Sequence, residues 1–313
     1  MESNKMKAVV CTAYGTPDVL QVQLVNKPKI KPNEYLVKII ASTVNSGDVR
    51  VRALRANGIQ RILMRLIIGL RKPRKQILGT VFSGIVVGKG ENTNEFAIGD
   101  EVYGLTGFGF STHAEFVAVK SNSVIARKPV NASFQEAAAI AFGGQTAHYF
   151  LHKAGIAAGA GKQVLIYGAA GAVGTAAVQI AKYFGARVTA VCSENGHELV
   201  NSIGADEIID YKKQEIKNLL GKYDIVFDAV GKLTQKDGRC LLNSKGVFFT
   251  VGGWQYAPEQ KAQLEFLSKL FEEGKYNATI GRVYNLVDCA EAHRYVDTDK
   301  KKGNVVLSIQ HEH

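Results

Sequence analysis

The residues best suited to chemistry are three glycines that follow an apolar stretch, in VLIYGAAGAVG at 164–174. Gly168, Gly171 and Gly174 come directly after a short apolar strand and open an alanine-rich helix, with Ala169 in place of the first glycine of a GxGxxG pattern. The first amides of a helix have no intrahelical partner and carry partial positive charge, so they attract phosphate. A tight turn whose glycines serve only packing is the alternative. The residues expected to bind a pyrophosphate are Ala170, Gly171, Ala172 and Val173.

The residues after the next expected strand, 187–192, bear on which dinucleotide is bound. Dinucleotide folds that bind NAD usually place an acid at the end of this strand to hold the ribose hydroxyls. Here that place falls at Cys192, and Ser193 follows, which leaves room for a 2′-phosphate and favours NADPH over NADH. Against this, Glu194 lies two positions beyond, although Lys212 and Lys213 could supply positive charge. The cofactor contacts expected at these strand ends are Ser193, Asn195, Tyr211, Val230, Gly231, Val251 and Gly252.

Two kinds of sequence pattern would position these residues. Residues 1–130 contain short Val- and Ile-rich strands separated by glycines, which is typical of a small, partly open β-barrel. Near residue 130 the pattern changes, and Ser133 with Glu136 forms a capping box that opens an alanine-rich helix. From residue 164 strands alternate with helices, which predicts a parallel sheet in an α/β fold. The helices expected there and in the tail span 172–184, 197–203, 214–220, 235–242, 259–273 and 287–297.

The composition excludes several classes of protein. The 313 residues are 46% hydrophobic and 21% charged, as in a globular chain of two domains, and no apolar run is long enough to cross a membrane. The first thirty residues contain acids and no continuous apolar segment, so we expect no signal peptide and a cytoplasmic location. The four cysteines are scattered and show no ligand spacing with histidine, so we expect free thiols and no metal.

Residues 50–75 are a local concentration of positive charge. They hold nine cationic side chains and no acid, in a chain of net charge +11, and their apolar residues recur at helical spacing between the arginines. We favour a helix that packs over the mouth of a cleft with its charged face in water. Electrostatic steering of NADPH or an acidic substrate, and a helix lying on a membrane surface, are alternatives. Nucleic-acid binding is not expected, because no aromatic residue is interleaved for base stacking.

Motifs along almost the whole chain carry a family resemblance. They are ASTVNSGD (41–48), LGTVFSGIVVGKG (78–90), GDEVYG (99–104), EAAAIAFGGQTA (136–147), YGAAGAVGTAAVQIAK (167–182), LVNSIGADEIIDY (199–211), FDAVG (227–231) and AHRYVDTDKKKGNVVL (292–307). With these motifs the chain resembles the zinc-independent, quinone oxidoreductase-like branch of the medium-chain dehydrogenase/reductase superfamily. The resemblance implies a Rossmann domain with a doubly wound parallel sheet at 131–282. It also implies a GroES-like β-barrel domain at 1–130, completed by 283–313.

The resemblance also implies how a site would be built. Zinc alcohol dehydrogenases of the superfamily place a cysteine in the segment that reads ASTVNSGD here, and a His-Glu pair where this chain has Thr80 and Val81, so we expect no catalytic zinc. Asn45 and Asp48 match the family's Asn-x-x-Asp motif beside the nicotinamide. Asn45 would donate an amide hydrogen to a carbonyl or orient a water, and Asp48 would orient Asn45 or a basic neighbour. An Asx turn is the structural alternative for Asp48.

Two further residues, Thr146 in GGQTA and Asn304 in GNVV, resemble cofactor-contacting positions of the family. Without a metal, the chemistry that remains is hydride delivery to an electron-poor acceptor. The prediction is therefore an NADPH-dependent oxidoreductase acting on a quinone or α,β-unsaturated carbonyl, with solvent as the proton donor. An enoyl-thioester reductase and a non-catalytic, NADPH-gated protein that binds RNA or a membrane surface are alternatives. Relatives carry a further strand and helix between the positions of Gly253 and Pro258, which puts the usual homodimer in doubt.

Overall fold

The computed structural model describes residues 4–55, 58–216, 222–252 and 257–311. The chain divides into two compact units. The β unit consists of Met1–Ala141 and Ile280–His313, and the α/β unit consists of Phe142–Thr279. We expected the junctions at 130/131 and 282/283, whereas this division lies at 141/142, inside helix α3 (Phe134–Lys153), and at 279/280.

A five-stranded parallel sheet forms the centre of the α/β unit. Its strands lie in the order β10-β9-β8-β11-β12. This is the 3-2-1-4-5 order of a doubly wound dinucleotide fold, in which the direction of winding reverses between β8 and β11. The parallel α/β sheet expected from the sequence is thus confirmed. The strands are β8 (Gln163–Tyr167), β9 (Arg187–Cys192), β10 (Glu207–Asp210), β11 (Tyr223–Asp228) and β12 (Leu242–Thr250).

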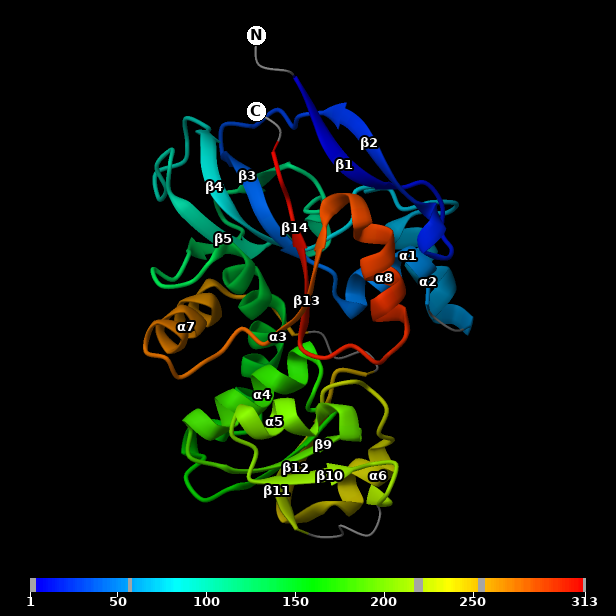
Figure 1. The fold of residues 1–313 in the computed structure, drawn as a ribbon, viewed down its shortest axis with the longest axis vertical. Helices are drawn as coiled ribbons and strands as arrows, with labels where there is room; N and C mark the ends of the chain where they lie inside the picture. The colour runs from blue at the N-terminus through cyan, green and yellow to red at the C-terminus, as the bar shows by residue number, and fades with distance from the viewer. Residues whose placement is uncertain (1–3, 56–57, 217–221, 253–256, 312–313) are drawn as a thin grey trace. The chain divides into compact units, whose positions relative to one another are not determined.

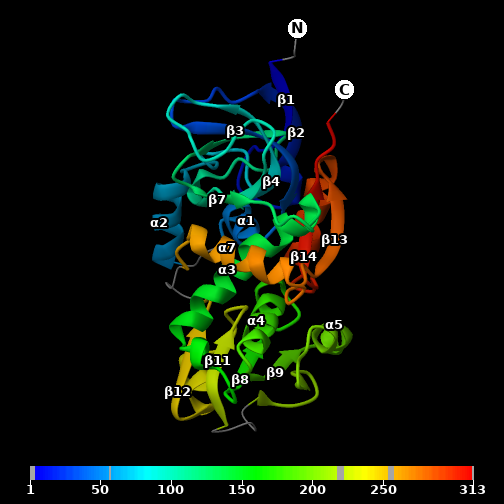
Figure 2. The ribbon, with the colours of Figure 1, turned by 90° about the vertical axis from the view of Figure 1, so that its left-hand side faces the viewer.

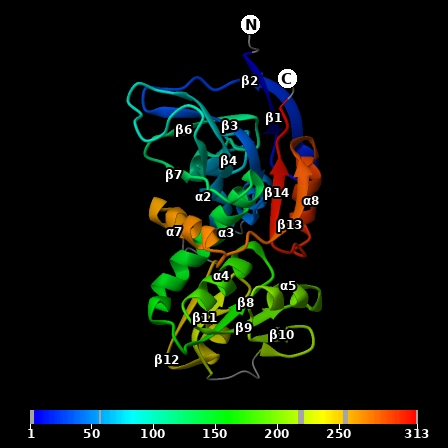
Figure 3. The ribbon, with the colours of Figure 1, turned by 60° about the vertical axis from the view of Figure 1, so that its left-hand side comes forward.

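The helices of this unit begin where local signals place them. Helix α4 (Ala172–Tyr183) follows the glycine turn and packs on β8 and β9 (Figure 3). The capping box that opens α3 is present: Glu136 N donates to Ser133 Oγ at 3.2 Å, and Ser133 N donates to Glu136 Oε2 at 2.8 Å. The remaining helices of this unit are α5 (His197–Ser202), α6 (Gln235–Cys240) and α7 (Lys261–Glu272).

Two expectations for this unit fall on residues outside the described ranges. The helix expected at 214–220 falls largely on residues 217–221, and the shortened connection after residue 252 falls on 253–256. Within the described part of the sheet, β12 pairs only with β11 and is therefore an edge strand.

The β unit is built on a mixed sheet in the order β13-β14-β3-β4-β5-β7, with β6 also paired to β3. Strand β14 lies antiparallel beside β3, so the tail of the chain joins the sheet made by the first part (Figure 1). Among the described strands, β13 and β7 end this order and β6 pairs only with β3, so the sheet does not close completely, as expected for an open barrel. The hairpin β1–β2 is a separate two-stranded sheet. The strands are β1 (Lys5–Cys11), β2 (Leu20–Asn26), β3 (Glu34–Thr43), β4 (Val81–Lys89), β5 (Glu101–Leu105), β6 (Phe116–Lys120), β7 (Val124–Arg127), β13 (Ile280–Asn285) and β14 (Asn304–Ser308).

Among the described residues, the α-helices that lie wholly in the β unit are α1 (Ser46–Ala53), α2 (Gly58–Ile68) and α8 (Cys289–Asp297). Helix α2 lies at the margin of this unit (Figure 2). Its Met64 and Ile68 pack against the core, whereas Ile62 and Ile67 are 61% and 68% exposed. The expected helix is present, but the side that it exposes to water carries apolar side chains as well as arginines. None of the described helices is both long enough and apolar enough to cross a membrane.

Candidate active site

The glycine turn between β8 and α4 brings backbone very close to backbone. The amides of Gly168 and Ala169 both donate to Val191 O, at 2.9 and 3.1 Å, and Gly168 has a φ of +77°. A Cβ at Gly174 would lie 2.2 Å from Gly168 O, so only glycine permits this approach of helix to strand. The third glycine of the motif thus has the close-packing role that a dinucleotide turn requires.

The first amides of α4 have no hydrogen-bond acceptor among the described residues. The first backbone hydrogen bond of the helix runs from Thr175 N to Gly171 O, at 2.8 Å, and Gly171 supplies no capping side chain. The amides of Ala172, Val173 and Gly174 therefore precede the intrahelical ladder. A Cβ at Gly171 would meet nothing nearer than 3.5 Å, so the space before the helix is open. This arrangement fits the pyrophosphate of a dinucleotide, because it combines donors, positive helix-dipole charge and room.

The strand ends beside this turn are organised by a buried carboxylate. Asp228, at the end of β11, accepts hydrogen bonds from the amides of Val230, Gly231 and Leu233 and from Thr250 Oγ1, at 2.9–3.2 Å. A Cβ at Gly231 would lie 2.9 Å from Gly252 Cα, so the loops after β11 and β12 touch there. The expected residues Val230, Gly231, Val251 and Gly252 are thus brought together where the winding of the sheet reverses.

The end of β9 carries the residues expected to select the cofactor. Ser193 is half-buried, and Glu194 and Asn195 are exposed. Glu194 forms an ion pair with Lys213 Nζ at 3.2 Å, so the acid that argued against a 2′-phosphate already has a cationic partner. Tyr211 follows β10, with its ring 6.2 Å from that of Tyr167 at the end of β8. The structure thus groups these residues at the carboxyl ends of β8, β9 and β10.

Thr146 lies on α3, near the start of α4. A Cβ at Gly143 would lie 2.5 Å from Ala172 O, which fixes where α3 crosses the first turn of α4. Thr146 is three residues further along and therefore on the same face of α3 as Gly143. Its side chain is largely buried. Its position suits a contact with a group held at the start of α4.

In the β unit, Asn45 and Asp48 form the capping box of α1. Asn45 Oδ1 accepts from the amides of Gly47 and Asp48 at 2.7 and 3.1 Å, and Asn45 N donates to Asp48 Oδ2 at 2.9 Å. Asn45 Nδ2 donates to Thr80 Oγ1 at 3.1 Å. Within the described part of the chain, Thr80 Oγ1 is the one acceptor found for the side-chain amide of Asn45, which has two N–H donors. Both residues thus have a structural role in the cap of α1, and the Asx-turn contact lies at Asn45, whose Oδ1 accepts from Gly47 N, rather than at Asp48. Asn45 keeps one donor for a further partner.

The environment of Asp48 is unusual for a carboxyl group. Its side chain is fully buried, and burial raises its pKa from 3.8 to about 7, although backbone hydrogen bonds from Asn45 and Gly79 oppose this rise. A buried carboxyl with a raised pKa beside a family motif is typical of a functional region. Asn304, the last residue predicted for the site, begins β14 and is buried opposite Ile280 of β13.

Sequence reasoning missed two groups. Asp228 was not singled out, although an acid directly after an apolar strand and before Val-Gly is a visible signal. It also missed a buried cluster of His113, Cys289 and His293 in the β unit. The spacing of Cys289 and His293, four residues apart on a helix, was the signal available for that cluster.

Comparisons with known proteins agree with this architecture. Residues 31–156 match the family described as alcohol dehydrogenase GroES-like domain, and residues 172–291 match that described as zinc-binding dehydrogenase. The chain is 33% identical to 2-methylene-furan-3-one reductase of Solanum lycopersicum, over 97% of this chain and 79% of that protein. The chain belongs to the medium-chain dehydrogenase/reductase superfamily. Within this superfamily it falls in the quinone oxidoreductase-like branch, as the sequence motifs indicated.

Other members of the superfamily give the same assignment. The chain is 31% identical to the chloroplastic NADPH-dependent alkenal/one oxidoreductase of Arabidopsis thaliana, over 97% of this chain and 79% of that protein. The solved quinone oxidoreductase of Coxiella burnetii superposes with a TM-score of 0.87 at 27% identity, covering 98% of this chain and all of that one. Superfamily membership confirms the Rossmann and GroES-like folds. It also makes the chain an oxidoreductase that uses a nicotinamide cofactor.

Proposed function

We propose that the protein is an NADPH-dependent reductase that transfers hydride to a quinone or an α,β-unsaturated carbonyl, without catalytic zinc. The open amide-rich start of α4 is the observation that carries the proposal, because it fits a dinucleotide pyrophosphate. Similarity to relatives named as alkenal/one, furanone and quinone reductases supports the acceptor class. The nicotinamide, when bound, supplies the hydride, and the chain supplies position and charge.

The choice of NADPH rests on the end of β9. A buried, neutral Cys192 stands where an NAD-binding acid would stand, and Ser193 beside it offers a hydroxyl to a phosphate oxygen. Lys213 lies at the same edge and neutralises Glu194. A 2′-phosphate there would meet a hydroxyl and a cation instead of an unpaired carboxylate.

In the proposed reaction, Asn45 acts directly on the acceptor. Its remaining amide N–H would donate to the carbonyl oxygen, where negative charge develops as hydride arrives. Asp48 would act as a positioning residue, because it accepts from Asn45 N and fixes the capping box. Solvent would supply the proton.

The absence of a catalytic zinc is proposed from the donor set. Thr80, Val81 and Asn45 stand at or near the positions that zinc alcohol dehydrogenases of the superfamily use for ligands. Thr80 and Asn45 are hydrogen-bonded to one another, and valine offers no donor atom. Catalytic zinc takes thiolate, imidazole or carboxylate ligands, so these three residues do not fit it. No step is therefore assigned to a metal.

The test is the oxidation of NADPH in the presence of quinones, free enones and enoyl-thioesters, with and without a chelator. We expect turnover that survives the chelator. Asn45→Ser keeps a capping oxygen but removes the amide donor, so it should lower kcat about 100-fold, while the exposed Asn94→Ser should not. Turnover of enoyl-thioesters alone would favour the thioester reductase. No turnover on any acceptor, with cofactor binding established, would refute the proposal.

Cofactor choice has its own test at Ser193. Ser193→Asp would place a carboxylate against the 2′-phosphate, and a like-charge contact of this kind should raise KM for NADPH at least about tenfold while KM for NADH changes little. Ser193→Asn is the neutral control of the same size. Equal effects of the two variants, or no effect of either, would contradict the assignment of NADPH to this strand end.

We infer further that α2 contacts a membrane surface. Ile62, Leu63, Leu66 and Ile67 are exposed beside Arg61 and Arg65, a combination that suits anionic headgroups over an acyl layer. Sedimentation with vesicles that contain phosphatidylserine tests this inference. Binding should fall in Ile62→Ser/Ile67→Ser and persist in the control Ile98→Ser, which removes an equally exposed isoleucine of the same unit. Equal sedimentation of both variants would contradict it.

A further inference from the structure

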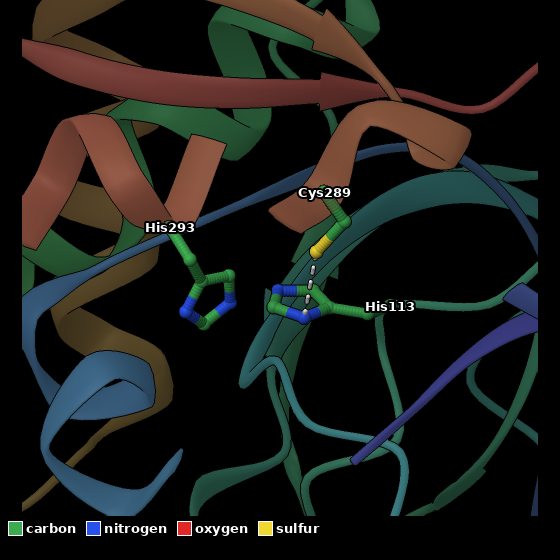
Figure 4. A group of neighbouring side chains, drawn as sticks. All are labelled: His113, Cys289 and His293. Carbon is green, nitrogen blue, oxygen red and sulfur yellow. Dashed lines mark hydrogen bonds between the residues drawn. The ribbon is translucent and has the colours of Figure 1, made fainter. Parts of the chain in front are cut away.

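Two imidazoles and a thiol meet in the interior of the β unit (Figure 4). They belong to His113, in the segment before β6, and to Cys289 and His293, one turn apart on α8. All three side chains are buried, and one donor atom of each lies within 4.8 Å of the other two. None of these residues belongs to the site described above. We propose that they form a metal site for a thiolate-binding ion, Zn²⁺ or Cu⁺.

The orientation of His113 is that of a metal ligand. Its Nε2 lies 3.1 Å from Thr43 O, which can only accept, so Nε2 carries the proton and Nδ1 keeps a lone pair. That Nδ1 faces Cys289 Sγ at 3.7 Å. Metal-bound histidines usually donate their other N–H to a carbonyl or carboxylate in this manner.

The distances suit a shared ion. Bonds of about 2.3 Å to sulfur and about 2.0 Å to nitrogen, at a tetrahedral angle, separate the two ligand atoms by about 3.5 Å. The observed separation of Sγ and Nδ1 is 3.7 Å. The third ligand, His293, has a ring nitrogen within 4.8 Å of the other two ligand atoms, and its ring lies edge-to-face with that of His113, with centroids 5.7 Å apart (Figure 4).

His293 is the residue that most needs a partner. Neither ring nitrogen has a hydrogen-bond partner among the described residues, although the side chain is completely buried. Unsatisfied polar groups in the interior are rare and costly, so such a group requires an explanation. Burial also lowers the pKa of His113 to about 4 and that of His293 well below its ordinary value, so both rings are neutral, as ligands must be.

Two side chains interact electrostatically with the thiol of Cys289. Arg52 lowers its pKa and is itself paired with Asp297 at 2.5 Å. Asp48 raises the pKa, as burial does more strongly, so the thiol is protonated when no ion is bound. The ion would displace one proton, from the thiol of Cys289, and form a sulfur–metal bond in its place. A single thiolate balances the charge of Cu⁺. Zn²⁺ would keep one positive charge and would take a fourth ligand, such as a water, to complete its tetrahedral coordination.

The proposed site would join parts of the chain that are distant in sequence. His113 belongs to the barrel made by the first 130 residues, and α8 belongs to the returning tail. Through Thr43 O the ion would also support the segment that leads into Asn45. Its expected role is therefore to hold the tail against the barrel rather than to take part in hydride transfer.

The test uses the full chain in a Cys240→Ser background, because Cys240 is an exposed thiol that could bind metal adventitiously. The protein is stripped with a chelator, offered Zn²⁺ or, without oxygen, Cu⁺, then desalted, and its metal content is measured. We expect about one equivalent of one of the two ions per chain and a rise in Tm of several degrees on loading. Co²⁺ should give the absorption of a cobalt–thiolate bond.

Matched variants decide the assignment. Cys289→Ser and His293→Gln should each weaken metal binding at least about tenfold and abolish the Co²⁺–thiolate absorption. Cys192→Ser, which alters a buried thiol of the α/β unit, should leave both unchanged. Far-UV circular dichroism and a cooperative thermal transition show that each variant is folded. Failure of the folded wild type to retain either ion, or equal retention by Cys289→Ser and Cys192→Ser, would overturn the proposal.

Discussion

Replacing Asp48 by asparagine should change how the stability of the protein depends on pH. Asp48 is fully buried, and burial raises its pKa from 3.8 to about 7. In the unfolded chain the carboxyl ionises near its ordinary value, whereas the folded protein holds the proton over a wider range of pH. Stability is therefore lost as pH rises between these two values, because the folded state binds more protons than the unfolded state does.

The magnitude follows from the two pKa values. Ionising the buried carboxyl costs the folded state on the order of 4 kcal/mol, since each tenfold change in an equilibrium is worth about 1.4 kcal/mol. Most of this cost develops between about pH 5 and about pH 8, where it amounts to on the order of 3 kcal/mol. Asparagine fits the same space and can still accept from Asn45 N through its carbonyl oxygen. Asp48→Asn should therefore gain stability relative to the wild type by about this amount across that range.

The assay is chemical unfolding of the metal-free protein at several pH values, for the wild type and Asp48→Asn. Other titrating groups are common to both proteins, so the difference between their free energies of unfolding isolates Asp48. Asp237→Asn is the matched control, because Asp237 has the same capping position on α6 but is exposed. A difference that stays constant, or that favours the wild type as pH rises, would show that the folded protein holds Asp48 as a stable carboxylate, and the reasoning would be refuted.

Two further pairs of variants test local packing and buried charge. Gly174→Ala should lower the free energy of unfolding by about 1–3 kcal/mol and weaken NADPH binding, because its Cβ would meet backbone at 2.2 Å, whereas Gly171→Ala meets nothing within 3.4 Å and should fold normally. Thermal unfolding with and without NADPH measures both effects, and equal destabilisation would argue against a close-packed turn. Arg52→Met should cost about 1–3 kcal/mol, because it removes the buried donor to Gly15 O and to Asp297, whose carboxylate is 19% exposed and keeps Arg55. Arg55→Met removes only the half-exposed partner of the same carboxylate and should cost less than about 1 kcal/mol. Equal denaturation midpoints for these two variants would show that the buried ion pair has no special weight.

The sequence contains the fold because its local signals agree with one another. Apolar β8 leads into glycines and then into α4, and the same alternation recurs through β9 and β11, so a parallel sheet with a phosphate-binding turn could be predicted. The capping box of Ser133 and Glu136 could be predicted for the same reason, because the two residues are only three positions apart. Such features depend on residues only a few positions apart, so the spacing and chemical type of these residues are enough to predict them.

Features that depend on tertiary contacts could not be predicted in this way. Helical spacing predicts α2 but does not say which side faces the core, and the structure leaves Ile62 and Ile67 exposed. The cluster of His113 with Cys289 joins residues 176 positions apart, and the spacing of Cys289 and His293 on one helix does not show that His113 lies beside them. The roles of Asn45 and Asp48 in hydride transfer remain predictions, since the capping box and the hydrogen bond from Asn45 to Thr80 are contacts within the β unit itself.

The α/β unit lies in sequence between the two segments of the β unit, and this order affects how the protein folds during synthesis. On the ribosome the chain emerges from its N-terminus, so all of Phe142–Thr279 is available before β14 exists to pair with β3. The α/β unit can therefore fold first. Until β14 is synthesised, the edge of β3 that pairs with it has no partner, because β14 lies more than half the chain away in sequence. Pairings of such long range form slowly and expose strand edges meanwhile. A pause in translation late in the chain should thus leave the β unit, and not the α/β unit, dependent on chaperones.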